Sequence, residues 1–403
     1  MRLAAGSAPG GPPGRRLSAM PDSQVQPKHK LRVPRAQRGP FRILLGTRKG
    51  AFVMDGDGTG RDFEAPRPAI LGRTCFHLVR DPFQRDVLLA AVRGPGETPT
   101  VMRSEDAGAT WTAADGPPRF GPAAPGARFE REVHQVFWLS PGHRRDRDTW
   151  FAGTCPQGLF RSDDGGRSWS PVEGLHGHPR FEEWTDLESD RTPDGPKLHS
   201  VYVDPRSSSR MTLAMSSGGV LATQDGGESW ERLEGGLDHD AAVTPQLVVP
   251  ATTNPDRLWM QGHHGLHRMD REEGVWVRTG PRDEDGEFHD AGFPVAVHPH
   301  DPDTCWVVPL GGESGGSRLP LGGRPALYRT QDAGETWERQ GAGLAEEGAW
   351  WTVKRQALAV DGCDPLGLYL GTSSGEVWAS RDEGESWARI ASGLPAIYSV
   401  EVG

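Results

Sequence analysis

One eight-residue pattern recurs five times along this chain of 403 residues. It reads Ser/Thr-x-Asp-x-Gly-x-x-Trp, and the copies are SEDAGATW (104–111), SDDGGRSW (162–169), TQDGGESW (223–230), TQDAGETW (330–337) and SRDEGESW (380–387). Two degenerate copies at 50–63 and 265–276 fill the remaining intervals. Self-similarity at a period of about fifty residues is typical of chains built from one repeated supersecondary unit. The pattern therefore predicts an array of similar units over residues 41–403.

Each unit has the same internal order. Two short apolar strands joined by a Gly-rich turn lead into the motif, as in LLGTRKGAFV (44–53) and LYLGTSSGEVWAS (368–380). A further strand upstream ends at an Asp-Pro or Pro turn, as in HSVYVDP (199–205). Four strands per unit and seven units predict an all-β fold, a seven-bladed β-propeller of four-stranded antiparallel blades.

The two ends of the predicted propeller complement each other. The first unit begins at FRILLGTRKG (41–50) without an upstream strand, whereas PAIYSVEV (395–402) follows the last unit as a strand without partners. We expect this C-terminal strand to complete blade 1 and close the ring.

The first forty residues differ in composition from the rest. They are rich in Gly and Pro, contain eight Lys or Arg and one Asp, and show no hydrophobic periodicity. We expect residues 1–40 to form a disordered basic tail, and Met20 is an alternative start. Residues 41–403 then form a single propeller domain.

Charge and cysteine spacing limit the partners. The chain carries a formal net charge of −10, which disfavours binding to nucleic acid phosphates or anionic membranes. It contains no apolar run typical of a signal peptide or membrane span. The four cysteines are far apart and lack zinc-site spacing, so we expect free thiols in the cytoplasm.

The motif aspartates are predicted to be structural. In a hairpin turn the carboxylate can accept N–H bonds from its own loop, the glycine two positions later can adopt positive φ, and the tryptophan can cover the hairpin. A catalytic residue would not need to recur five times around a ring. The predicted structural aspartates are Asp106, Asp164, Asp225, Asp332 and Asp382.

The motif resembles a known repeat. Its form is similar to the Asp-box, or BNR, repeats of sialidases, sortilin-type receptors, xyloglucan-hydrolysing glycosidases and a photosystem assembly factor. The longer segments LLGTRKGAF, GLFRSDDGG, LHSVYVDP and HPHDPDTCWVVPL resemble bacterial single-propeller proteins labelled sialidase-like or glycosyl-hydrolase-like. The resemblance covers nearly all of the chain after residue 40 and implies the fold, but these boxes do not specify an activity.

We do not expect a true sialidase. Such enzymes resemble this chain in the boxes but have six blades, and Leu44 in FRIL (41–44) replaces the proline of their signature. None of the four tyrosines lies in a recognisable nucleophile context (Tyr202, Tyr328, Tyr369 and Tyr398).

Histidines are concentrated where the propeller topology places the upper face of the ring, near its axis. His77, His134 and His199 open the first strands of blades 2, 3 and 4, and His263 lies in a turn of blade 5. Neutral imidazoles that converge in this way can bind a divalent metal ion. The alternative is that these histidines line a water-filled channel and bond to one another or to the backbone.

Further residues are predicted on the same face. The catalytic candidates are His134, His199, Glu182 and Glu183, because imidazoles and paired carboxylates serve as acids and bases. The ligand-binding candidates are Arg48, Lys49, Trp184, Gln246 and Arg355.

Two functions remain open at this stage. One is a sialidase-like or glycosyl-hydrolase-like propeller that binds a small carbohydrate-like ligand in a His-rich central funnel, as a glycoside hydrolase or a metal-dependent lyase. The other is a non-catalytic propeller that binds a protein partner or acts as an assembly factor.

Overall fold

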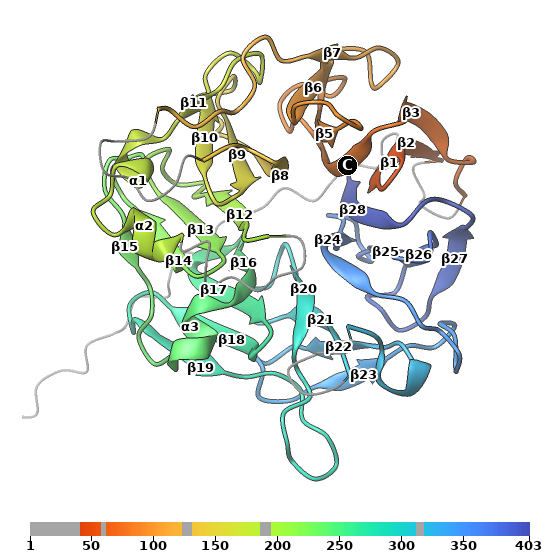
Figure 1. Ribbon diagram of the computed structural model, residues 1–403. Helices are drawn as coiled ribbons and strands as arrows, with labels where there is room; N and C mark the ends of the chain where they lie inside the picture. Colours follow the sequence, from red (N-terminus) through yellow and green to blue (C-terminus); the bar gives the residue numbers. More distant parts are fainter. Residues whose placement is uncertain (1–40, 58–61, 123–130, 186–194, 312–317) are drawn as a thin grey trace, which may run out of the picture. The chain divides into compact units, whose positions relative to one another are not determined.

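A computed structural model describes residues 41–57, 62–122, 131–185, 195–311 and 318–403. Antiparallel β-strands account for most of the regular secondary structure in this part of the chain (Figure 1). The predicted tail, residues 1–40, lies outside it. Short helical segments are found in the connections: α1 (Glu173–His176), α2 (Phe181–Trp184), α3 (His239–Val243) and the 3₁₀ turn η2 (Leu321–Gly323). None of the helices in the described ranges is long and apolar enough to span a membrane.

Five four-stranded sheets are found among the described residues, and in each the strands pair in chain order. They are β4–β7 (Thr74–Arg80, Leu88–Arg93, Thr100–Ser104, Thr112–Ala113), β8–β11 (Gln135–Pro141, Trp150–Cys155, Leu159–Ser162, Ser170–Pro171), β12–β15 (Leu198–Val203, Met211–Met215, Gly219–Thr223, Glu231–Arg232), β16–β19 (Pro245–Ala251, Asn254–Gly262, Gly265–Asp270, Val275–Arg278) and β20–β23 (Gly292–Val297, Cys305–Pro309, Leu327–Thr330, Glu338–Gln340).

An eight-stranded sheet joins the two ends of the domain. Its order is β27-β26-β25-β24-β28-β1-β2-β3, and its strands are β24–β27 (Val353–Val360, Leu368–Thr372, Val377–Ser380, Ala388–Ala391), β28 (Ile397–Val402) and β1–β3 (Phe41–Thr47, Gly50–Gly56, Arg67–Leu71). The C-terminal strand β28 pairs antiparallel with β1, as the sequence predicts, whereas a single parallel bridge, Gln356 to Ser399, links it to β24.

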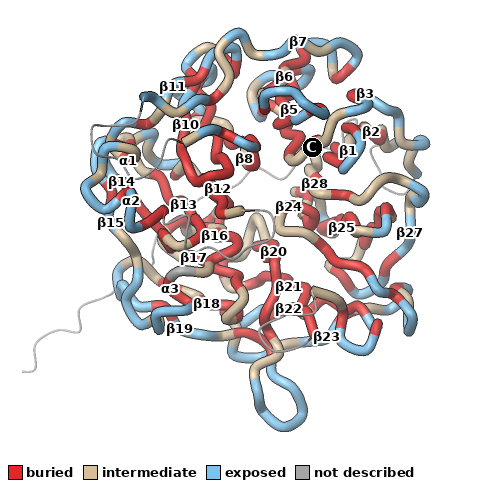
Figure 2. The backbone as a smooth tube through the Cα atoms, in the orientation of Figure 1, coloured by how far each residue is buried: buried red, intermediate tan, exposed pale blue. Residues whose placement is uncertain are grey.

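The first strands of the sheets form a closed cycle. Contacts run from β28 to β4, β8, β12, β16, β20 and β24 and back to β28 (Figure 1). These strands are largely buried, whereas the outermost strands such as β7, β19 and β27 are mostly exposed (Figure 2). This arrangement is that of a β-propeller.

The core lies between neighbouring sheets. All five residues of β13 (MTLAM) and of β14 (GVLAT) are buried, because both faces of these strands pack against other elements. Trp150, Trp259 and Trp306 are among the largest fully buried side chains. The four cysteines are all described, and none forms a disulfide.

Each motif aspartate is bonded within its own loop. Asp164 accepts hydrogen bonds from the Ser162 hydroxyl at 2.7 Å, the Ser168 N–H at 2.9 Å and the Ser168 hydroxyl at 2.5 Å. Gly166 has φ +89° and offers its carbonyl oxygen to the Trp169 indole N–H at 3.1 Å. A residue with a side chain would be strained at that φ, which accounts for the glycine.

The other four motif loops repeat these bonds. In each, the aspartate accepts from the hydroxyl two positions before it and from the N–H and hydroxyl four positions after it (Asp106, Asp225, Asp332 and Asp382). The aspartates thus satisfy the donors of tight turns, as a structural role requires.

The motif loops make stability sensitive to acid. Hydrogen bonds from the Thr110 hydroxyl, the Thr110 N–H and the Ser104 hydroxyl hold the pKa of Asp106 at about 2. The unfolded carboxylate takes up its proton near pH 4, so the free energy of unfolding should fall as pH drops from about 4 to about 2. In urea denaturation at each pH, Asp106→Asn should reduce this dependence by the share of Asp106 and leave that of the other four motif aspartates, and Thr110→Val should reduce it by part of that share. An unchanged slope in Asp106→Asn would contradict the role of these bonds.

The closing strand should be essential for stability. Ile397 on β28 is fully buried, so Ile397→Ala should lower the free energy of unfolding by about 2–5 kcal/mol, through lost burial and the cavity left behind. Val402 on the same strand is only partly buried. Val402→Ala should cost clearly less in the same urea titration, and equal costs would argue against a packed closing strand.

Candidate functional site

Four of the inner strands bring side chains together around Arg355. The Arg355 Nε on β24 donates to the Gln246 Oε1 on β16 at 2.6 Å, although the sheet of β20 lies between their sheets in the cycle. The guanidinium carbon lies 5.0 Å from the centre of the Phe293 ring on β20 and 5.6 Å from that of Phe137 on β8. One hydrogen bond and two aromatic rings therefore hold this half-buried cation in position.

Further basic groups surround Arg355. The buried Lys197 donates to the Gly195 carbonyl oxygen at 2.6 Å, and its Nζ lies 5.8 Å from the Phe137 ring centre. The ring centres of His263 and Phe293 are 5.6 Å apart, and the guanidinium carbon of Arg318 lies 5.9 Å from the centre of the Phe293 ring. With His199, these residues form what we call the central cluster: Phe137, Lys197, His199, Gln246, His263, Phe293, Arg318 and Arg355.

His199 is buried at the start of β12. Its Nε2 lies 2.8 Å from the Ser216 hydroxyl oxygen, whereas its Nδ1 has no hydrogen-bond partner among the described residues. Burial, and then the charges of Arg355, Lys197 and His263, hold the pKa of His199 well below its ordinary value. The imidazole is therefore neutral at physiological pH.

The cluster also spans the ring. Gln356, the neighbour of Arg355, donates from Nε2 to the Phe137 carbonyl oxygen on β8 at 2.8 Å. Arg355, His263 and Arg318 are only partly buried, so water reaches the cluster from their side. Chemically, the arrangement can offer positioned hydrogen-bond donors and positive charge to a polar ligand.

The predicted metal site does not fit the structure. No group of three or more His, Cys, Asp or Glu side chains in the described ranges is placed to hold a metal ion. His77 is buried with both nitrogens engaged: Nδ1 accepts from the Leu139 N–H at 3.0 Å, and Nε2 lies 3.1 Å from the Glu401 carboxylate. His134 is exposed. Of the four predicted ligands (His77, His134, His199 and His263), only His199 and His263 come together.

The residues predicted on the loop before blade 4 form a separate group. Trp184 is buried, stacks on His178 with ring centres 4.1 Å apart, and belongs to the core around α2, so it is a packing residue and not a sugar platform. The exposed Glu183 pairs with Arg180 at 2.7 Å, which lowers the pKa of Glu183. No described contact joins Glu182 or Glu183 to the central cluster.

Two further predicted ligand residues lie on a surface turn. Arg48 and Lys49 are exposed between β1 and β2. Within the described chain, no hydrogen bond or ring contact links either side chain to the central cluster. Of the predicted ligand-binding residues, the structure therefore brings together Gln246 and Arg355.

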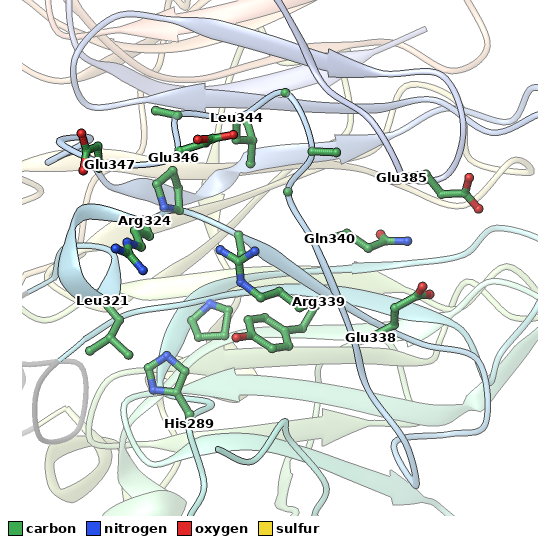
Figure 3. A pocket seen from close by; sticks show the side chains of 18 residues that line it. His289, Leu321, Arg324, Glu338, Arg339, Gln340, Leu344, Glu346, Glu347 and Glu385 are labelled. Atoms are coloured by element: carbon green, nitrogen blue, oxygen red, sulfur yellow. The ribbon is translucent and has the colours of Figure 1, made fainter. Parts of the chain in front are cut away.

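A groove beside β23 was missed by the sequence analysis. Its volume is about 1220 Å³, and it is lined by β23, the loop that follows it and the segment around η2. Glu346 and Glu347 lie on one side and Glu338 and Glu385 on the other, with Arg339 between them (Figure 3).

One sequence signal could have pointed to this groove. In AEEGAWW (345–351), two residues separate the acidic pair from two tryptophans, of which Trp350 is 62% exposed and Trp351 is buried in the core. Trp350 lies against Gly323, where an added Cβ would come within 3.0 Å of the indole. Carboxylates and an exposed aromatic ring are the groups that glycosidases use to cleave and position sugars.

Comparisons with known proteins identify the fold. No family model matches the chain. It is 23% identical over 224 residues to an oligoxyloglucan-reducing end-specific xyloglucanase of Emericella nidulans, covering 47% of this chain and 25% of that protein. It is 30% identical over 263 residues to a xyloglucanase of Acetivibrio thermocellus, and the alignment covers 59% of this chain and 28% of that protein.

Similarity to solved structures also indicates a β-propeller fold. The GH74 xyloglucanase of Xanthomonas campestris aligns with TM-score 0.62 at 19% identity, covering 89% of this chain and 53% of that one. The chain thus spans about a quarter of the curated relatives and about half of the solved xyloglucanase. These relatives support a glycosyl-hydrolase-like β-propeller.

The field of Arg355 at His199 can be measured. Among the charged groups, Arg355 has the largest effect on His199, and Arg355→Met removes this charge while His199 stays buried. The pKa of His199 should therefore rise but remain below its ordinary value. Nitrogen-15 NMR titration of the histidine side chains would follow it. Arg389→Met on the exposed outer strand β27 of the same sheet is the matched control and should leave the titration unchanged. Coincident titrations in all three proteins would show that the two side chains do not interact.

Proposed function

We propose that this chain is a seven-bladed, glycosyl-hydrolase-like Asp-box propeller that binds a small carbohydrate-like ligand at the central cluster. The observation that carries the proposal is the position of Arg355, bonded to Gln246 and held by the rings of Phe137 and Phe293. The cycle of seven inner strands supports the blade count, and the five self-bonded motif loops support the Asp-box assignment.

A carbohydrate is the ligand class that these donors favour. Sugars are recognised by a few polar groups held in fixed positions on a concave or partly buried surface. Arg355 is fixed by contacts from three other inner strands, so little side-chain entropy would be lost on binding. The relatives are named xyloglucanases, which supports a glycan ligand for this fold.

Binding to oligosaccharides would test this proposal. We expect calorimetry with a panel that includes xyloglucan oligosaccharides and acidic and neutral oligosaccharides to detect at least one ligand. Arg355→Met and Gln246→Ala should weaken its binding by tenfold or more, which corresponds to about 1.4 kcal/mol. Arg389→Met, on the outer strand of the same sheet, should bind as the unmodified protein does.

Binding that is insensitive to Arg355 and Gln246 would refute the central site. A protein that binds no glycan but captures a stoichiometric protein partner would favour the alternative of a non-catalytic assembly platform.

The second candidate function is glycoside hydrolysis in the groove of Figure 3. It is favoured by the carboxylates on opposite sides of the groove, since one can act as acid and the other as base or nucleophile. The exposed Trp350 nearby could stack on a sugar ring.

Release of new reducing ends from xyloglucan oligosaccharides would test the groove. Glu346→Gln, Glu347→Gln and Glu385→Gln would be compared with Glu335→Gln, an exposed glutamate that does not line the groove. At least one groove variant should lose about a hundredfold or more in rate, as expected for a general acid or base. Equal rates in all four variants, or no release by the unmodified protein, would exclude hydrolysis of this substrate there.

A further inference from the structure

We infer that the ligand of the central cluster is an acidic sugar, and that His199 donates a hydrogen bond from Nδ1 to its oxyanion. The inference rests on the proposed binding function and specifies its ligand class. A carboxylate and a phosphate share the required chemistry, so a hexuronic acid and a sugar phosphate are its two sources.

The hydrogen bonds of Ser216 fix the tautomer of His199. The Ser216 hydroxyl oxygen accepts the Lys197 N–H at 3.2 Å and lies 2.8 Å from His199 Nε2. The Ser216 hydroxyl hydrogen needs an acceptor, and among its described contacts Nε2 is the one that can take it. Nε2 is then the acceptor, so the single hydrogen of the neutral ring lies on Nδ1.

The Nδ1–H group is left without an acceptor. It is buried, and no atom of the described residues accepts its hydrogen bond. Other buried donors in the described chain, such as Trp150 Nε1, also lack a partner. His199 differs from them because basic groups act on it and their neighbours are partly exposed, so we infer that a bound acceptor completes its bonding. An oxygen atom of a ligand would supply it.

The charges near His199 define the kind of oxygen atom. The three groups with the largest effect on it, Arg355, Lys197 and His263, are all basic. Arg318 lies on the same Phe293 ring as Arg355. Arg355 lies on β24, Lys197 just before β12, His263 between β17 and β18, and Arg318 between β21 and β22, so four parts of the ring contribute these charges to a chain whose net charge is −10. Charge-assisted bonds from fixed basic donors favour a carboxylate or phosphate over a neutral hydroxyl.

Matched sugars test the charge requirement. Binding of glucuronic acid, glucose 6-phosphate and glucose would be measured at millimolar concentrations by ligand-observed NMR and calorimetry. We expect at least one of the two acidic sugars to bind ten times more tightly than glucose. Arg355→Met should remove that preference, whereas Arg389→Met should retain it. The better of the two acidic sugars identifies the source of the oxyanion.

The tautomer is tested in the unmodified protein, so the test does not depend on a variant that folds. Long-range proton–nitrogen NMR should show the His199 hydrogen on Nδ1, and addition of the acidic sugar should shift that nitrogen. His199→Phe should weaken binding of the acidic sugar with little change for glucose.

The outcomes separate this inference from the proposed function. Equal binding of glucose and both acidic sugars, still dependent on Arg355, would leave a central sugar site but overturn its acidic specificity. A hydrogen on Nε2 would overturn the role of His199. Failure of these three sugars and of the whole oligosaccharide panel would overturn both proposals.

Discussion

The antiparallel pairing of β28 with β1 is the constraint on which the rest of the structure depends. It joins the last described strand to the first, so the inner strands pack around a closed cycle. Without β28, strand β1 would lose its pairing partner on that side, and an unpaired strand edge invites association with other chains. Closure also sets the distance across the ring, and the central cluster exists because side chains on separate sheets reach one another across it.

The parts that the sequence predicted best are those whose bonds are local. A motif aspartate finds its donors within four residues, so the loop can form before the ring is complete and its pattern is visible in a single segment. The strand order and the closing strand were predictable for a related reason, since each unit repeats one arrangement of strands and turns. The contact of Gln246 with Arg355 followed from placing strand starts near a common axis.

The histidines show where this reasoning failed. Whether His77 can bind a metal depends on its bonds with Leu139 and Glu401, which lie on other sheets. The sequence around His77 does not predict these partners. His134 lies just before β8 begins, whereas His77 lies within β4, and His134 is exposed. The groove was missed because Glu346 and Glu385 lie on different segments, which line one groove only after the chain has folded. Sequence periodicity locates a residue along its strand but does not supply its partners.

The bond from Gln356 to the Phe137 carbonyl has a mechanical consequence. It links β24 directly to β8, although their sheets lie well apart in the cycle. The adjacent Arg355 packs on the ring of the same phenylalanine. Displacement of the blade that carries β8 would therefore shift Phe137 and Arg355 together. A ligand bound to Arg355 would therefore contact a side chain whose position is linked to two sheets at once, those of β24 and β8.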